Sequence, residues 1–358
     1  MAIDTRTNGQ RLRDTLTFNG TGEVPVWGGF SMATWLKYGD ALIDVVNRYP
    51  EIPWWRPEKG TDFAALVGPA NRAYEECLDN WGCLWYCIRH GMEGQITSHP
   101  LDDIRHLKHY KAPDPLIYNE RGLHNWGAFA RACRGANAAG EMVTIGGERF
   151  FERVHFIRGM ENALADMAMG TPEIDEIVDL VLQYNLQYLE HALKLGSPVD
   201  LVGFGDDWGC QERCLISPDT FRKYFKPGYT KMYSLCKQYG ALTTQHSDGH
   251  TVDLWEEFLE AGLTAFNMQV NCMGIDVTRD RLRGRMCIVA SIDRQYILPI
   301  GTPAQVREHI AELVTKLGSP KGGFILAIDV YPDVPLENID ALLSACVEYK
   351  DYWVTKQK

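Results

Sequence analysis

Short apolar runs alternate with amphipathic stretches through the second half of the chain. The apolar runs predict buried strands over residues 199–205, 241–245, 264–268, 286–290 and 323–328. The stretches that follow them have helical periodicity and predict helices over residues 217–239, 252–261, 277–283, 303–317 and 336–349. Because continuous apolar strands that alternate with helices are typical of parallel sheets, this half of the chain predicts consecutive βα units.

The first half of the chain contains weaker patterns. They predict strands over residues 24–27 and 141–145, a long helix over 173–195, and a further βα pair within 61–85. No linker or low-complexity tract divides the chain. We therefore expect an α/β fold, a single (β/α)8 TIM barrel over residues 1–358 with an N-terminal extension of about residues 1–20. An open doubly wound sheet is the alternative, but the Gly-rich phosphate turn typical of that fold is missing from the sequence.

Composition narrows the class of protein. Hydrophobic residues make up 45% of the chain and charged residues 23%, which are values typical of a folded protein. The net charge of −11 argues against nucleic-acid binding, which needs a basic face. No apolar run approaches the roughly 18 residues of a membrane span, and no signal-peptide pattern opens the sequence. The ten cysteines include no Cys-x-x-Cys pair, so we expect reduced thiols and a cytoplasmic protein without a membrane partner.

Tryptophan is concentrated in the first third of the chain, at positions 27, 35, 54, 55, 81, 85 and 126. Such large aromatic side chains fill cores and also line pockets for flat or aromatic ligands. The sequence leaves both interpretations open.

Polar side chains follow five successive predicted strands, and in a barrel these strand ends surround one pocket. The residues are Asp206, Asp207, Trp208, His246, Asp248, Asn267, Gln269, Ser291, Asp293, Gln295 and Asp329.

His246 and Asp248 form the most specific pair among these residues. Side chains two positions apart in a strand point to the same face, so the two can share one metal or ligand. A metal-ligand or acid–base pair is the functional interpretation, and a capping Asp beside a satisfied loop His is the structural alternative. Of Asp206 and Asp207, one is expected to brace the loop and the other to face the pocket. We assign the pocket role to Asp206 because it continues the strand more directly.

Several motifs at these strand ends occur together. They are Asp206-Asp-Trp-Gly-Cys-Gln211, Ile216-Ser-Pro218, His246-Ser-Asp-Gly249, Asp293-x-Gln295, Leu298-x-x-Gly-Thr-Pro303 and Pro335-x-Glu-Asn338. As a set they resemble the uroporphyrinogen decarboxylase superfamily, over about residues 10–350. The resemblance implies a (β/α)8 barrel, and the superfamily includes true decarboxylases and corrinoid-linked methyltransferases.

The resemblance favours the methyltransferase branch. True decarboxylases bind substrate carboxylates with paired arginines after the first strand, whereas residues 28–35 contain no arginine here. Members of the superfamily that methylate thiols hold zinc with a His-x-Cys motif and a second Cys nearer the C-terminus. This chain has Asp248 in place of the first Cys and Asp329 near the position of the second. A metal, with zinc as the candidate, would then be held by His246, Asp248 and Asp329 in a harder site than one with two thiolates.

The expected function is a corrinoid-dependent methyltransferase. It would act on a small methylated donor, such as an aryl methyl ether, with His246 as metal ligand or acid, Asp248 as its partner and Asp206 orienting donor or metal. No Asp-x-His-x-x-Gly motif occurs, so we expect the corrinoid to come from a separate corrinoid protein. Substrate contacts are expected from Trp27, Phe30, Asp79, His155, Trp208, Gln211, Gln269 and Asp293.

Two other functions stay open at this point. One is a decarboxylase or lyase acting on another small carboxylic acid, and the other is a non-catalytic ligand-binding barrel. The methyl donor, the direction of transfer and a homodimeric state are not determined by the sequence.

Overall fold

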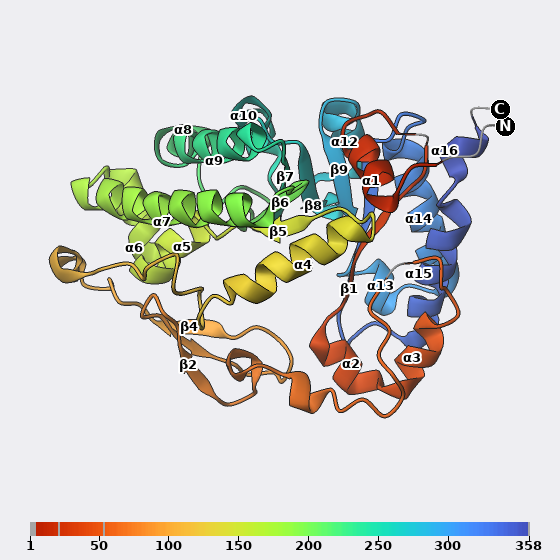
Figure 1. The fold of residues 1–358 in the computed structure, drawn as a ribbon, viewed down its shortest axis with the longest axis horizontal. Coiled ribbons are helices and arrows are strands. Elements are labelled where there is room, and N and C mark those ends of the chain that lie inside the picture. Colours follow the sequence, from red (N-terminus) through yellow and green to blue (C-terminus); the bar gives the residue numbers. More distant parts are fainter. Residues whose placement is uncertain (1–4, 21, 53, 357–358) are drawn as a thin grey trace. The chain divides into compact units, whose positions relative to one another are not determined.

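A computed structural model describes residues 5–20, 22–52 and 54–356 (Figure 1). The chain divides into two compact units. Unit 1 holds the residues up to Arg13, Cys77–Trp85 and Ile96–Phe266, and unit 2 holds Asp14–Glu76, Tyr86–Gln95 and the residues from Asn267 onward. Organisation as a single domain over residues 1–358 therefore stays a prediction.

Unit 1 is built on three parallel strands: β5 (Thr144–Gly146), β6 (Leu201–Gly205) and β7 (Leu242–Ser247). Its main helices are η3 (Ile104–His109), α4 (Trp126–Ala138), α5 (Phe151–Arg158), α6 (Met160–Met169), α7 (Pro172–Gly196), α8 (Pro218–Tyr224), α9 (Lys226–Gln238), η4 (Val252–Leu254) and α10 (Trp255–Ala261). Helices follow strands as predicted, and Figure 1 shows α7 and α9 beside each other.

Unit 2 contains the parallel strands β1 (Val26–Phe30), β9 (Cys287–Ser291) and β10 (Phe324–Val330). Its helices include α2 (Met32–Tyr38), α3 (Asp40–Val46), α11 (Val270–Met273), α12 (Ile275–Leu282), α13 (Ile297–Ile300), α14 (Pro303–Leu317), α15 (Leu336–Tyr349) and α16 (Tyr352–Thr355). Five of the described elements run from one unit into the other: α1 (Asn8–Leu16), β2 (Glu76–Leu78), β3 (Leu84–Tyr86), β4 (Gln95–Ser98) and β8 (Ala265–Gln269).

The sheet confirms the predicted fold class. Seven strands belong to one sheet in the order β1-β10-β9-β8-β7-β6-β5, and the pairs β1–β10, β10–β9, β7–β6 and β6–β5 are parallel. Parallel strands joined by helices in sequential order make this an α/β fold of the TIM-barrel type. Among the described residues the sheet has seven strands rather than eight.

The predicted βα pair over residues 61–85 is wrong. This stretch holds the short helices η1 (Ala64–Leu66) and η2 (Pro69–Asn71), followed by β2 (Glu76–Leu78) and β3 (Leu84–Tyr86). With β4 (Gln95–Ser98) these strands form a separate three-stranded sheet. Pro69, together with glycines at positions 60, 68 and 82, interrupts the segment too often for a regular crossover helix.

Helix boundaries in the second half lie close to the predicted ones. Helices α14 and α15 have the predicted bounds, and α14 begins with a capping box between Thr302 and Gln305. The predicted helix over 217–239 is divided at Phe225, because Pro227 has no N–H to continue the ladder and lies in the first turn of α9 instead. None of the described helices combines the length and apolar character needed to cross a bilayer.

Candidate functional site

Three polar side chains of unit 1 meet at the carboxyl ends of β6 and β7. Nε2 of His246 lies 3.3 Å from Oδ1 of Asp248 and 3.7 Å from Oδ1 of Asp207. One potential metal-ligand atom from each of Asp207, His246 and Asp248 lies within 4.8 Å of the corresponding atoms of the other two residues. The side chains are 36%, 33% and 44% exposed, while Oδ1 of Asp248, the oxygen beside the imidazole, is itself shielded from solvent. We call this group the His246 cluster.

Strand register explains why these three residues meet. Strands β6 and β7 are parallel, with Gly205 opposite His246, which places Asp207 opposite Asp248 one pleat further on. The backbone N–H of Asp248 donates to Oδ1 of Asp207 over 2.8 Å. This bond orients the Asp207 carboxylate toward the imidazole of its neighbour.

Two glycines allow the two loops to approach closely. Gly249 has a φ of +75°, and a Cβ placed on it would lie 2.4 Å from the carbonyl carbon of Gly209. A Cβ on Gly209 would in turn lie 2.5 Å from the backbone N of His250. The N–H of His250 donates to the carbonyl of Cys210 over 2.7 Å. Any side chain at either glycine would push Asp207 away from the other members of the cluster.

Trp208 anchors the same loop from the protein interior. Its side chain is 0% exposed and stacks on Phe151 with ring centroids 4.3 Å apart. Its backbone N–H donates to Oγ of Ser247 over 2.9 Å, which links the loop after β6 to the end of β7. The structure thus places Trp208 in the core, while its predicted substrate contact would require an accessible ring.

Asp206 has different surroundings from Asp207. Its carboxylate is 1% exposed and accepts hydrogen bonds from the backbone N–H groups of Phe150 and Glu152, at 3.0 and 2.8 Å, and from the Tyr229 hydroxyl. Burial raises the pKa of the Asp206 carboxyl to about 6, and these hydrogen bonds oppose that rise. Asp206 therefore braces the start of α5, and Asp207 is the carboxylate beside His246.

The sequence contains a signal that distinguishes the two aspartates. Side chains alternate along a strand, so Asp206 shares a face with the buried apolar residues Val202 and Phe204. Asp207 shares the other face with Gly203 and Gly205, whose missing side chains leave space beside the cluster. Sequence reasoning missed Asp207 because it followed strand continuity and did not use this alternation.

Asp79 is fully engaged within unit 1. It accepts hydrogen bonds from the backbone N–H groups of Trp81 and Cys83, from Nε1 of Trp85 and from the guanidinium of Arg153. A substrate contact through this carboxylate would have to displace one of these donors.

His155 is 8% exposed and packs edge-on against the rings of Phe151 and Phe156. Burial, together with the nearby His99, Arg149 and Arg153, lowers the pKa of His155 to about 3, so its imidazole is neutral. Gln211 lies exposed in the loop after Cys210. The substrate roles of His155 and Gln211 stay predictions.

The remaining predicted residues belong to unit 2. Phe30 packs edge-on against Trp35 and Trp54 at 5.4 and 5.1 Å. The Asp293 carboxylate accepts from the backbone N–H groups of Gln295 and Tyr296, which stabilises its own turn. The other three occupy strands, at Trp27 in β1, Gln269 at the end of β8 and Asp329 in β10. The substrate roles of these residues, and metal binding by Asp329, stay predictions.

The His246 cluster fits a catalytic metal ion. Zinc at ligand distances of about 2.0–2.2 Å, in tetrahedral geometry, separates its ligand atoms by roughly 3.4 Å. The separations of Nε2 of His246 from the Asp248 and Asp207 oxygens, 3.3 and 3.7 Å, are close to that spacing. One imidazole and two carboxylates would fill three positions and leave the fourth for a substrate or water, as catalytic zinc sites require. Asp207 supplies the third group within unit 1.

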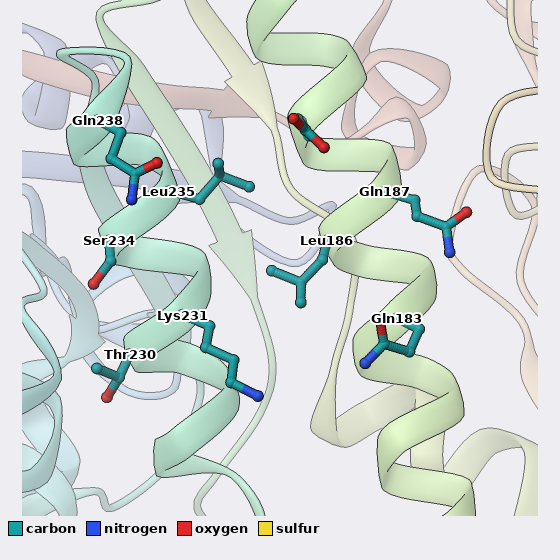
Figure 2. Close-up of a pocket in the computed structure, with 9 residues that line it drawn as sticks. Gln183, Leu186, Gln187, Thr230, Lys231, Ser234, Leu235 and Gln238 are labelled. Atoms are coloured by element: carbon teal, nitrogen blue, oxygen red, sulfur yellow. The ribbon is translucent and has the colours of Figure 1, made fainter.

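A second feature of unit 1 is a groove of about 580 Å³ between α7 and α9 (Figure 2). It is lined by Gln183, Leu186, Gln187, Glu190, Thr230, Lys231, Ser234, Leu235 and Gln238. None of the predicted site residues lines it.

Comparison with known proteins places the chain in a family. The family model described as uroporphyrinogen decarboxylase (URO-D) matches residues 152–349, more than half of the chain. A methyltransferase from Methanosarcina mazei has a similar structure, with a TM-score of 0.65 and 17% sequence identity, over 96% of this chain and 99% of that chain. At this identity the likeness concerns the fold alone.

Other similarities are more distant. A D-psicose 3-epimerase in the presence of D-fructose aligns with a TM-score of 0.40 and 7% identity, over 64% of this chain and 85% of that chain. An IOLI protein with a binding zinc atom aligns with a TM-score of 0.32 and 12% identity, over 64% and 93%. Both scores are too low to bear on function. A search of curated proteins found no match. The family model, which covers the His246 cluster, shows that the chain belongs to the uroporphyrinogen decarboxylase family.

Proposed function

We propose that the chain is a corrinoid-dependent methyltransferase. It would move a methyl group between a small methylated donor, such as an aryl methyl ether, and the cobalt of a separate corrinoid protein. The His246 cluster carries the proposal, because it gathers a potential acid and two potential metal-binding carboxylates at one exposed place. Family membership and the fold shared with a solved methyltransferase support it.

The chemistry of ether cleavage explains the need for such a cluster. A reduced Co(I) corrinoid is itself the nucleophile, so the protein does not have to supply one. As the carbon–oxygen bond breaks, the methyl group passes to cobalt, which is formally oxidised by two electrons. The electron pair of the broken bond stays on oxygen, which then takes up a proton. Stabilising the negative charge that develops on this oxygen is the task left to the protein.

The cluster can meet this task in two ways. Without a metal, a proton on Nε2 of His246 lies within reach of both carboxylates and can pass to the leaving oxygen. With zinc held by Asp207, His246 and Asp248, the metal would act as a Lewis acid for that oxygen. In either case Asp207 is pre-oriented by its hydrogen bond from the backbone of Asp248.

The setting of the protein is part of the proposal. All ten cysteines are free thiols, which is consistent with a reducing cytoplasm. Such a compartment also suits a Co(I) corrinoid, which is readily oxidised. The corrinoid partner is proposed because the chain carries no Asp-x-His-x-x-Gly motif of its own.

The test is an anaerobic assay with free cob(I)alamin and a panel of methoxylated aromatic and aliphatic donors, followed by the absorbance change on cobalt methylation. We expect His246→Ala and Asp207→Asn to lose at least about 100-fold in rate, the range of general acid catalysis. Asp219→Asn is the matched control, because Asp219 is an exposed residue of α8. Wild-type rates in His246→Ala would overturn the assignment. Release of CO2 from small carboxylic acids without corrinoid would favour a lyase instead.

A further inference from the structure

A strip of the sheet beside the His246 cluster carries no side chains. The parallel register pairs Gly146 of β5 with Gly203 of β6, and Gly205 of β6 with His246 of β7. Paired residues of adjacent strands face the same side of a sheet, so the three glycines and His246 share one face. A Cβ built on Gly146 or Gly205 would meet nothing within 4 Å, and one on Gly203 would meet its nearest atom at 3.6 Å. We call these three residues the glycine floor, and the space above it is open.

Glu148 lies at the far edge of the glycine floor from the His246 cluster. The ladder between β5 and β6 continues into the next residue, because the N–H of Gly147 donates to the carbonyl of Gly203 over 2.6 Å. A Cβ on Gly147 would lie 2.5 Å from the ring of Phe204, which packs toward α9 on the other face of the sheet. Side chains alternate along an extended chain, so the side chain of Glu148 points to the face of the glycine floor.

The protein does not engage the carboxylate of Glu148. Within the part of the chain that the structure describes, this carboxylate forms no hydrogen bond and no ion pair. Burial raises the pKa of the Glu148 carboxyl, and the nearby charges of Arg153, Glu120 and Arg149 also act on it. An enclosed polar group without a partner in the protein is a candidate for binding a ligand.

The spacing between Glu148 and the His246 cluster fits one aromatic ring. Strands lie about 4.8 Å apart and side chains stand roughly perpendicular to the sheet, so positions two strands apart are separated by about 9.6 Å. A hydrogen bond at Glu148 takes up about 2.7 Å of this, and a metal–oxygen contact at the cluster about 2.0 Å. About 5 Å remain between the two contacted atoms, which a single benzene ring with a substituent at each end fills.

The charges around Glu148 indicate which substituent it would meet. An anionic group would face the charges of Glu148 and Glu120, and a cationic group would face those of Arg149 and Arg153. A neutral hydroxyl donates to the carboxylate and needs no opposite charge. The surroundings therefore favour a hydroxyl.

We propose that Glu148 is a specificity-determining residue that binds a hydroxyl at the far end of the methyl donor, across the glycine floor from the His246 cluster. This rests on the proposed function, which supplies the reaction at the cluster. The donor is then a methoxyphenol whose ring lies over the glycine floor, where a side chain would block it. The methoxy oxygen would meet the cluster and the hydroxyl would meet Glu148.

Four donors that differ in one substituent test the assignment. They are 4-methoxyphenol, methoxybenzene, 4-methoxybenzoate and 4-methoxybenzylamine, which present a hydroxyl, a hydrogen, a carboxylate and an ammonium group. Isothermal titration calorimetry without corrinoid measures their binding, and kcat/KM with free cob(I)alamin measures methyl transfer. The variants are Glu148→Met, which removes the carboxyl at similar length, and Gly205→Val, which fills the glycine floor. Glu176→Met is the matched control, because Glu176 is an exposed glutamate of α7.

We expect the wild type to bind 4-methoxyphenol at least about tenfold more tightly than methoxybenzene, the range of a hydrogen bond to a charged group. Glu148→Met should lose this preference and should bind 4-methoxybenzoate more tightly than the wild type does. A residue with a purely structural role would not produce that gain. The urea midpoint of Glu148→Met should equal or exceed the wild-type value, because an enclosed carboxyl without a partner is removed. Gly205→Val should lose binding of all four donors at an unchanged midpoint, and the control should behave as wild type.

Several results would overturn the role of Glu148. Equal binding of 4-methoxyphenol by the wild type and Glu148→Met, with methyl transfer intact, would do so and would leave the proposed function standing. A lowered urea midpoint in Glu148→Met would assign the residue to the fold. Tighter wild-type binding of 4-methoxybenzylamine or 4-methoxybenzoate than of 4-methoxyphenol would make this a site for a cation or an anion. If no donor methylates cob(I)alamin but Glu148→Met still loses the preference for 4-methoxyphenol, the proposed function fails while the hydroxyl site stands.

Discussion

The close approach of Gly209 and Gly249 gives the sharpest prediction about the site. Alanine at position 249 would bring two separate penalties. The residue has a φ of +75°, a conformation that disfavours an L side chain by about 1–2 kcal/mol. The new Cβ would also lie 2.4 Å from the carbonyl carbon of Gly209, so the loops must separate by roughly 1 Å to restore van der Waals contact.

Gly240 offers a matched control within the same unit. Its φ is +77°, but a Cβ there would meet nothing within 4 Å. Gly240→Ala therefore carries the conformational penalty alone, about 1–2 kcal/mol of unfolding free energy. Gly249→Ala should lose about 1–3 kcal/mol more, the usual range for overpacking. It should also lose about 100-fold in methyl transfer, because a displacement of 1 Å at reacting groups has effects of that size.

Urea unfolding of both variants and methyl transfer to free cob(I)alamin check this prediction. Comparable losses of stability and activity in the two variants would refute the idea that the glycine contact positions Asp207 beside His246. A loss of stability alone in Gly249→Ala would show that the loops separate without affecting the reacting groups.

Two further predictions concern buried charge in unit 1. Arg153→Met leaves the buried Asp79 carboxylate without its cation, so unfolding free energy should fall by about 3–5 kcal/mol, and adding Asp79→Asn should restore part of the urea midpoint. His155 has a folded pKa of about 3, below the unfolded value of about 6.5, so the unfolded chain takes up the proton first as pH falls. The contribution of the neutral His155 imidazole to the unfolding free energy is therefore complete above pH 6.5 and declines as the pH falls toward 3. At pH 5 this contribution has fallen by about 2 kcal/mol. Urea midpoints should therefore fall less between pH 7 and pH 5 in His155→Gln than in wild type, and parallel falls would assign the pH dependence elsewhere.

Hydrophobic periodicity predicted much of the second half of the chain. The bounds of α14 and α15 followed from regular apolar spacing, with a capping box at the start of α14. Residues 61–98 escaped prediction because their structure depends on turns and tertiary contacts. The hairpin between β2 and β3 is held by Asp79, whose cation Arg153 lies 74 residues away in the sequence. Pairings over such separations leave no periodic signal in a single sequence.

The site was predictable to the level of strand ends but not to the level of individual carboxylates. His246 and Asp248 were paired from their spacing, and the structure places them 3.3 Å apart. The choice between Asp206 and Asp207 depended on which face each one occupies. That face follows from the alternation of side chains along β6, where Asp206 shares a face with the buried Val202 and Phe204. That Asp207 then meets His246 follows from strand register, which pairs Gly205 with His246 and is a property of two segments together.

The adjacent aspartates should therefore separate stability from activity. In Asp206→Asn, an amide replaces one of the buried oxygens that accept from Phe150, Glu152 and Tyr229, which should lower the unfolding free energy by about 1–3 kcal/mol. Asp207→Asn changes a half-exposed side chain, so its unfolding free energy should shift by less than about 0.5 kcal/mol while methyl transfer is lost. Urea midpoints and rates with free cob(I)alamin decide between them. If Asp206→Asn lost activity at an unchanged midpoint, the roles of the two carboxylates would be reversed, and the alternation of faces along β6 would not be what selects the residue beside His246.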